Sequence, residues 1–354
     1  MSYYKLIRPL LHAMPPEQAH NLGLWALRNG LLPKRRLLVD PSLAVSQWGL
    51  SFAHPVGLAA GFDKNASAVG ALFGQGFSFV EAGTVTPKPQ SGNPTPRIFR
   101  LKEDAAVINR LGFNNDGLQS FLESSQQQAR TGIFGANIGK NKDSEDAISD
   151  YLIALETVYP IADYITINIS SPNTLGLRAL QKREALKELL TALMDSRETL
   201  QAQHQCTVPL LLKIAPDLDE DDLQGVCETA RALSIDGMIV SNTTIKRPRS
   251  LKSPYHGEQG GLSGAPLFAL STEILSRVYA LTEGKIPLVG VGGISSAEDA
   301  YKKIRAGASL VQLYSAVVYQ GFGVVRQIVS GLPALLKKDG FSHISEAVGA
   351  DHRK

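Results

Sequence analysis

The sequence has 354 residues, of which 44% are hydrophobic and 19% are charged, with 32 glycines. This is the composition of an ordinary soluble globular protein, and the length suffices for a large hydrophobic core. The two cysteines, Cys206 and Cys227, exclude a disulfide framework and a cysteine-based metal site. No secretory signal is expected, because the N-terminus lacks an uninterrupted apolar core followed by a small-residue cleavage site.

The net charge of +3 is unevenly distributed along the chain. Residues 1–36 carry six basic side chains and one acidic one, whereas the remainder carries 30 basic and 32 acidic side chains. Basic segments can bind nucleic acid. Here the basic residues are interleaved with Leu, Ile and Trp, which favours a membrane surface. We therefore expect residues 1–36 to be a separate functional piece and expect no nucleic-acid partner.

Within this segment, residues 3–14 and 17–32 are expected to form two short helices around Pro15-Pro16. Their apolar residues form stripes at helical spacing: Leu6, Leu10, Met14, Leu22, Trp25 and Leu32. One interpretation is a helical cap packed on the rest of the protein. The other is a pair of interfacial membrane helices, with the basic residues 34–36 on anionic lipid head groups.

Beyond about residue 50, short apolar strands alternate with helical patterns. The expected strands are 55–60, 77–84, 133–138, 163–169, 209–214, 236–242, 287–293 and 308–314. Helices are expected between them, for example at 179–200 and 219–234. Eight strands with intervening helices favour an α/β protein with a (β/α)₈ barrel (TIM barrel), and a doubly wound open sheet is the alternative. The expected divisions are an N-terminal helical extension at 1–40, a barrel at 41–340 and a C-terminal tail at 341–354.

Residues 306–325 carry no charge over a length that matches a membrane span. The segment contains Ser, Gln and several Gly, and its hydrophobicity breaks in the middle. We therefore interpret it as a buried strand, a tight loop and the start of a helix.

Polar residues and glycines cluster at the carboxyl ends of the predicted strands: Lys64, Thr84, Asn137, Asn168, Lys213, Asn242, Gly292, Gly293, Tyr314 and Ser315. In a barrel these ends converge on one mouth, where active sites lie. The set contains amides, lysines and glycines, without an acid–base pair or a metal cluster. It indicates a site that binds a polar planar molecule.

The last two strands end in GVGGI (290–294) and LYS (313–315). Loops after strands seven and eight of such barrels commonly bind phosphate, which predicts a cofactor phosphate at Gly293, Tyr314 and Ser315. The alternative is a set of tight-turn glycines alone. No Walker sequence is present and GVGG lacks the dinucleotide pattern, so NAD is not supported.

Two lysines stand out at the predicted mouth. Lys213 follows three leucines in an apolar strand, and a buried lysine without a partner is costly. It either pairs with an acid or faces an anion, such as the pyrimidine end of a reduced flavin. Lys64 ends the first strand, and its neighbour Asp63 is a possible ion-pair partner.

Four asparagines recur in local runs: Asn109, Asn168, Asn173 and Asn242. A single asparagine is more often a turn former than a ligand. Several amides around one ring, however, match the alternating C=O and N–H groups of a pyrimidine. The stretch NISSPNTLGLR (168–178) adds two serines, and composition alone does not separate Ser170 from Ser171 as a reactive group.

The ordered motifs run over nearly the whole chain: AAGFDK (59–64), EAGTVTPKPQ with GN (81–93), PRIFRL (96–101), INRLGFNN (108–115), NIGKNK (137–142), NISSPNTLGLR (168–178), KIAPDL (213–218), SNTT (241–244), GGLSG (260–264), GVGGI (290–294) and LVQLYS (310–315). With these motifs the sequence resembles the dihydroorotate dehydrogenases, and among them the membrane-associated, quinone-dependent class 2 form. The resemblance implies oxidation of (S)-dihydroorotate to orotate in pyrimidine synthesis, with FMN as the bound cofactor and a membrane quinone as the electron acceptor.

The resemblance also implies roles for individual residues. FMN would be held by Ala60, Gly61, Phe62, Asp63, Lys64, Thr84, Asn137, Asn168, Lys213, Ser241, Gly264, Gly293, Tyr314 and Ser315. The family more often has Thr at position 241, and Ser241 keeps the hydroxyl. Substrate contacts would be Lys64, Asn109, Arg110, Leu111, Gly112, Phe113, Asn168, Asn173, Asn242 and Thr243.

By the same resemblance, Ser171 is the catalytic base, where the soluble class 1 forms use cysteine. Thr174 and the loop around Phe113 would relay its proton and exclude bulk solvent, and Lys213 would stabilise the reduced flavin. Serine is a weak base at its ordinary pKa, so it requires activation.

The class 2 resemblance favours the membrane interpretation of the N-terminal helices. It implies an apolar tunnel for quinone, with His20, Arg100 and Tyr314 at its polar inner end, and a peripheral location on the cytoplasmic face of a bacterial inner membrane. Two alternatives are another FMN-dependent barrel oxidoreductase with a different substrate, and a non-catalytic membrane-binding barrel.

Overall fold

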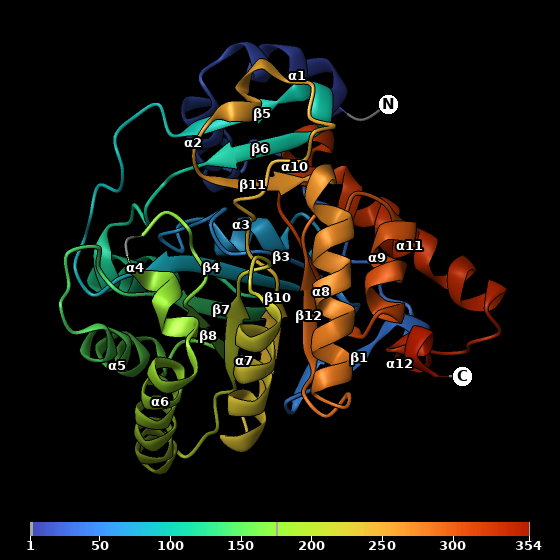
Figure 1. The fold of residues 1–354 in the computed structure, drawn as a ribbon. Coiled ribbons are helices and arrows are strands. Elements are labelled where there is room, and N and C mark those ends of the chain that lie inside the picture. The colour runs from blue at the N-terminus through green and yellow to red at the C-terminus, as the bar shows by residue number, and fades with distance from the viewer. Residues whose placement is uncertain (1–2, 175, 354) are drawn as a thin grey trace.

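The computed structural model describes residues 3–174 and 176–353 and shows a closed parallel barrel surrounded by helices (Figure 1). The eight strands follow chain order around the barrel: β3 (Val56–Leu58), β4 (Phe79–Val85), β7 (Ile133–Ile138), β8 (Tyr164–Asn168), β9 (Leu210–Ile214), β10 (Gly237–Val240), β12 (Leu288–Val291) and β13 (Ala308–Leu313). The predicted barrel is confirmed, and each predicted strand overlaps one of these. An open doubly wound sheet is excluded, because β13 pairs with β3 and closes the ring.

The outer layer consists of helices that follow the barrel strands in the chain: α3 (Val69–Phe73), α4 (Gly117–Gln126), α5 (Ala147–Val158), α6 (Arg183–His204), α7 (Glu220–Ala232), α8 (Phe268–Leu281), α9 (Ala297–Arg305), α10 (Ser315–Gln320) and α11 (Gly323–Lys338). The Asp219 carboxylate caps α7 by accepting the N–H of Asp222 at 2.8 Å. The helix expected at 179–200 is interrupted, because Lys182 is extended and separates a short 3₁₀ turn from α6.

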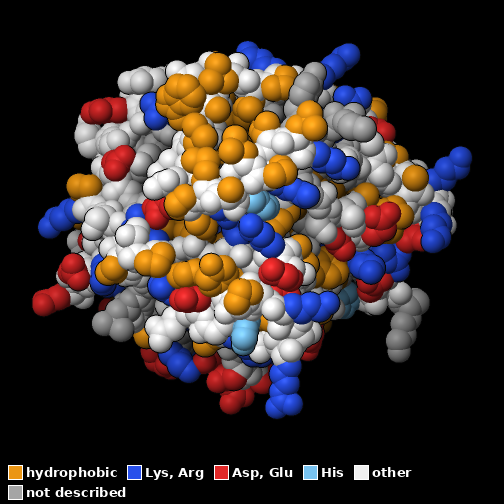
Figure 2. Space-filling view, turned by 90° about the horizontal axis from the view of Figure 1, so that it is seen from above, with side chains coloured by type: hydrophobic (Ala, Val, Ile, Leu, Met, Phe, Trp, Pro, Cys, Tyr) orange, Lys and Arg blue, Asp and Glu red, His pale blue; other side chains and the backbone are white. Residues whose placement is uncertain are grey.

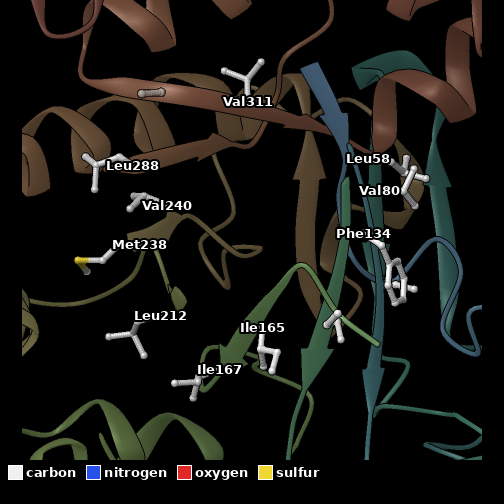
Figure 3. Close-up of a cluster of buried hydrophobic side chains, with 14 of the residues drawn as sticks. Leu58, Val80, Phe134, Ile165, Ile167, Leu212, Met238, Val240, Leu288 and Val311 are labelled. Atoms are coloured by element: carbon white, nitrogen blue, oxygen red, sulfur yellow. The ribbon is translucent and has the colours of Figure 1, made fainter. Parts of the chain in front are cut away.

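The barrel strands alternate between an outer and an inner face. Outward side chains such as Leu212, Val240 and Val311 pack beneath the helices, where each buried aliphatic chain contributes about 1.5–3 kcal/mol (Figure 3). Inward side chains of the lower layer are apolar: Phe79, Tyr164, Leu211, Ile239, Val289 and Leu310. Two residues further along their strands the inward positions become polar, as at Glu81, Lys213 and Gln312. The barrel interior is therefore apolar at one end and polar at the carboxyl end.

Two N-terminal helices, α1 (Tyr3–Ala13) and α2 (Pro16–Arg28), lie over the carboxyl end of the barrel beside a three-stranded antiparallel sheet (Figure 1). The sheet comprises β5 (Ile98–Leu101), β6 (Ala106–Asn109) and β11 (Gly261–Gly264). The two predicted helices are confirmed, but the expectation that the second extends to residue 32 was wrong. It ends at Arg28, because Asn29 caps the carbonyl of Trp25 and Gly30 takes a left-handed φ of 67°.

The hairpin of β1 (Val45–Gln47) and β2 (Leu50–Phe52) covers the opposite end of the barrel, where the Phe52 ring meets Phe79 at 5.4 Å. The uncharged segment 306–325 forms β13, α10 and the start of α11, as predicted. No helix within the described residues is long and apolar enough to cross a membrane. The expected C-terminal tail forms α12 (Ile344–Ala347) and packs back on α9, where Gly349 donates its N–H to the Ile304 carbonyl at 3.1 Å.

Candidate active site

A cavity of about 680 Å³ extends from the carboxyl ends of the barrel strands to the inner faces of α1 and α2. Most of the predicted site residues line it: Ala60, Gly61, Phe62, Lys64, Thr84, Asn109, Leu111, Gly112, Phe113, Asn168, Ser171, Asn173, Lys213, Ser241, Asn242, Thr243, Gly264, Gly293, Tyr314 and Ser315. His20 and Arg100 also line it, from α2 and β5. Four predicted residues do not line the cavity: Asp63, Arg110, Asn137 and Thr174.

A buried hydrogen-bond network forms the polar floor of the cavity. The Asn168 side chain donates to the Thr84 hydroxyl at 2.8 Å, and that hydroxyl donates to the side-chain amide oxygen of Asn137 at 2.5 Å. Asn137 in turn donates to Glu81 at 2.7 Å. Asn137 thus orients Thr84 from behind the cavity wall. The sequence-based predictions do not include Glu81. It could have been found, because a charged residue within an apolar strand is also the pattern that identified Lys213.

Lys213 is 5% exposed, and its Nζ lies 4.0 Å from a carboxylate oxygen of Glu81. Burial lowers the pKa of Lys213, and Glu81 partly opposes that shift. Lys213 therefore has an acid nearby and also lines the cavity, and the interpretation that it faces an anion stays a prediction. At 4.0 Å the carboxylate compensates its charge only in part, which leaves Lys213 suited to an anionic ligand.

Lys64 and Asp63 do not form the ion pair that their adjacency suggested. The Asp63 carboxylate accepts the N–H groups of Ser67 and Ala68 at 3.0 and 2.7 Å, so it shapes a turn. Lys64 instead faces the cavity, and burial lowers its pKa to about 8, partly opposed by Glu17. A partly buried cation at this wall favours an anionic substrate.

The two serines of the loop after β8 have different environments. Ser170 is fully buried, donates to Asn168 at 3.0 Å and accepts from Asn242 at 2.9 Å. Ser171 lines the cavity, and its Oγ accepts the N–H of Asn173 at 3.2 Å. The geometry therefore leaves the Ser171 hydroxyl proton available at the cavity wall, while that of Ser170 is used internally.

The loop is held in place by a residue that carried no assigned role. Arg178 donates to the Ser170 carbonyl at 3.1 Å and pairs with Asp217 at 2.9 Å. It also donates to the Thr243 carbonyl at 3.2 Å, so it joins this loop to the one after β10. In the sequence Arg178 is visible only as an arginine within a polar loop. Its role was not predicted, because its partners are distant in the chain.

The asparagines converge on the same part of the cavity. Asn173 donates to the Asn109 carbonyl at 3.1 Å, and both side chains line the cavity with Asn242. Arg110 points away, because it pairs with Glu258 at 2.7 Å. Of the two proposed relay residues, Phe113 lines the cavity, whereas Thr174 is buried beside it.

A glycine cradle forms another wall. A Cβ at Gly293 would come within 2.5 Å of Phe268, and one at Gly264 within 2.4 Å of the Ala105 carbonyl oxygen. The hydroxyls of Ser263 and Ser315 lie 2.9 Å apart beside them. Larger residues are therefore sterically excluded, and the exposed backbone here suits a phosphate.

The far end of the cavity lies between the barrel and the N-terminal helices. Arg100 donates to the carbonyls of Leu11, at 2.8 Å, and Met14, and so anchors the end of α1. Burial lowers the pKa of His20 to about 4, and its Nε2 has no partner among the described residues. The Phe62 ring lies 5.0 Å from His20 and 5.7 Å from Tyr314. A neutral imidazole and aromatic rings therefore connect the polar and apolar ends.

Comparisons with known proteins give the family. The family model of dihydroorotate dehydrogenase matches residues 42–336. A dihydroorotate dehydrogenase (quinone) of Azorhizobium caulinodans is 53% identical over 100% of both chains, and a mitochondrial one of Oryza sativa is 48% identical over 99% of this chain and 80% of its own length. The crystal structure of an Eimeria tenella dihydroorotate dehydrogenase in complex with ferulenol superposes with a TM-score of 0.92, at 43% identity over 96% of each chain. The chain therefore belongs to the dihydroorotate dehydrogenase family, within its quinone-dependent class of oxidoreductases.

Proposed function

We propose that the chain oxidises (S)-dihydroorotate to orotate with a bound FMN and passes the electrons to a membrane quinone, as a step of pyrimidine synthesis. The observation that carries this proposal is the continuity of one cavity, which joins a floor of amides, lysines and a serine to an apolar end under α1 and α2. A polar anion and an apolar electron acceptor can thus approach the same cofactor from two sides.

The residues present fit FMN. The glycine cradle with Gly264, Gly293 and Ser315 suits its phosphate, and Lys213 suits the pyrimidine end of its ring. Thr84 and Asn168, fixed by the polar floor, are the proposed polar partners of the same ring. When bound, FMN supplies the hydride acceptor.

Ser171 is the proposed base for the proton at C5 of dihydroorotate. The N–H of Asn173 donates to its Oγ at 3.2 Å, which stabilises negative charge there as the proton leaves. Phe113, which lines the cavity, is the proposed shield against bulk water, and Thr174, whose buried hydroxyl has no partner among the described residues, is the proposed relay for the Ser171 proton. Asn109, Asn173 and Asn242 orient the substrate, and Lys64 compensates its charge.

The N-terminal helices are the proposed membrane contact, on the cytoplasmic face of a bacterial inner membrane. Leu6, Leu10 and Trp25 are 71%, 70% and 55% exposed, so these helices present a large apolar surface to the solvent. Figure 2 shows hydrophobic side chains gathered at this end of the molecule with basic residues among and around them. Such a face suits insertion into the interface of an anionic bilayer.

The test is the absorbance spectrum of the purified protein before and after anaerobic addition of dihydroorotate. We expect an oxidised flavin spectrum that bleaches on addition, and a shift of the flavin bands when orotate is added to the oxidised protein. A flavin that neither bleaches nor shifts would indicate an FMN oxidoreductase with another substrate. A colourless protein that takes up no FMN would reject the proposal.

A further inference from the structure

Lys303 of α9 is a buried cation that the proposed reaction does not use. Its side chain is fully buried, and its Nζ donates to the Ser271 hydroxyl at 2.6 Å and to the Val291 carbonyl at 3.4 Å. Both acceptors are uncharged. Burial lowers the pKa of Lys303 well below its ordinary value, and Asp299 opposes this only in part. A protonated lysine here lacks a close anion of its own, which is costly.

The contacts of Lys303 lie directly behind the glycine cradle. Ser271, which accepts from Lys303, has two acceptors in reach of its one hydroxyl proton, the Gly292 carbonyl at 3.1 Å and the Phe268 carbonyl at 3.2 Å, and the Gly292 contact is the shorter. The Gly292 C=O and the Gly293 N–H belong to one trans peptide unit, so holding the carbonyl toward α8 turns the N–H the other way. Gly293 lines the cavity, and no hydrogen bond from its N–H is found in the part of the chain that the structure describes.

We infer that Lys303 is the buried counter-charge of the phosphate monoester held by the Gly292-Gly293 loop, and that it acts through the loop as a positioning residue. The inference rests on the proposed use of FMN. It names a residue that would make the protein prefer FMN to a flavin without the phosphate. Lys303 contributes a positive potential from behind the loop, and through Ser271 it fixes the peptide that offers the free N–H. Both effects act on the phosphate and spare the isoalloxazine ring.

The test compares the binding of FMN and riboflavin to flavin-free protein, because riboflavin has the same ring without the phosphate. Lys303→Met keeps the length of the side chain and removes its charge. We expect it to weaken FMN binding on the order of ten- to a hundredfold and to leave riboflavin binding unchanged. Lys302→Met is the matched control, because Lys302 is the exposed neighbour on the same helix, and both affinities should stay at the wild-type values.

A second variant covers the case in which Lys303→Met does not fold. Ser271→Ala keeps the lysine but cuts its link to the Gly292 carbonyl, and it should lower the preference for FMN over riboflavin by a smaller factor. The inference would be overturned if whichever of Lys303→Met and Ser271→Ala fold kept the wild-type preference for FMN over riboflavin. Equal losses for both flavins would also overturn it, since they indicate a general packing role. Wild-type protein that binds neither flavin would instead reject the proposed function.

Discussion

The two ends of the cavity are built in opposite ways. At the barrel end, side chains from neighbouring strands are fixed by short hydrogen bonds, as in the path from Asn168 through Thr84 and Asn137 to Glu81. At the helix end, apolar side chains of α1 and α2 face outward, and polar anchors such as Arg100 and Arg97 join these helices to the barrel. The difference matches the two proposed tasks, since removing a proton and a hydride would need fixed polar atoms, and admitting an apolar acceptor would need an adaptable apolar surface.

The largest expected effect comes from removing the base at the polar end. Ser171→Ala should slow flavin reduction by dihydroorotate on the order of 10²- to 10⁴-fold, because it removes the proposed base. FMN and orotate should still bind, since the floor network does not use the Ser171 hydroxyl. Anaerobic stopped-flow reduction measures the rate, and flavin band shifts with orotate measure binding.

Ser170→Ala is the matched control for that variant. It removes a hydroxyl that bonds Asn168 and Asn242, so a smaller loss, shared between orotate binding and rate, is expected. If Ser171→Ala reduced the flavin at a near-normal rate in a single turnover, Ser171 would not be the catalytic base.

The next effect should appear only at the apolar end. Replacing both Leu10 and Trp25 by Asp places two charges on the exposed face and should raise the KM for a long-chain quinone in anionic vesicles by about tenfold or more. Flavin reduction by dihydroorotate should be unchanged, because neither residue contacts the polar floor. Sedimentation with vesicles gives the membrane binding directly.

Ile153→Asp is the control, because Ile153 is also an exposed apolar side chain, at 46%, but lies on α5 of the barrel wall. It should leave vesicle binding and quinone kinetics unchanged. Equal losses from both changes would mean that α1 and α2 are an ordinary cap and not a membrane contact.

A smaller effect depends on pH at the boundary between the two ends. The pKa of Lys64 is lowered to about 8, chiefly by burial, so in the free enzyme its charge is lost as the pH rises above that value. The kcat/KM for dihydroorotate should then fall by up to about tenfold per pH unit, because the substrate anion loses a cation. In Lys64→Arg the side chain stays charged, so the fall of kcat/KM at high pH should disappear. If the fall persists in this variant, it is caused by the titration of another group.

The sequence predicts the barrel end better than the helix end. The strand periods and the polar residues at the strand ends place Lys64, Asn168 and Lys213 on one cavity, because a closed parallel barrel brings all strand ends together. The residues behind that wall were missed. Glu81 carried a local signal, a charged residue within an apolar strand, but its partners come from other strands. Lys303 contacts side chains from other elements, and no local pattern reports such contacts.

The separation of Ser170 from Ser171 shows the same limit. The two are adjacent and identical, and only the resemblance to a family distinguished them in the sequence. In the structure the distinction is physical, because Asn242 from the loop after β10 binds one hydroxyl and leaves the other at the cavity. The end of α2 depended on a cap at Asn29 that the apolar pattern did not include.

The smallest expected effect concerns the ion pair of Glu17 and Arg97, which ties α2 to the residue just before β5 at 2.6 Å. Arg97 lowers the pKa of Glu17, so the stabilisation is present at neutral pH and is lost as the pH falls below the ordinary range of glutamate. Because the pair is partly exposed, Glu17→Gln should cost about 0.5–1 kcal/mol, seen as a roughly two- to fivefold faster hydrogen exchange in α2 at neutral pH. Exchange in the barrel strands should not change, and Glu283→Gln, at an exposed ion pair of the barrel, should leave α2 at the wild-type rate. If Glu17→Gln accelerated exchange equally in α2 and in the strands, the helices and the barrel would unfold as one unit. The contrast between a fixed polar end and a yielding apolar end would then be wrong.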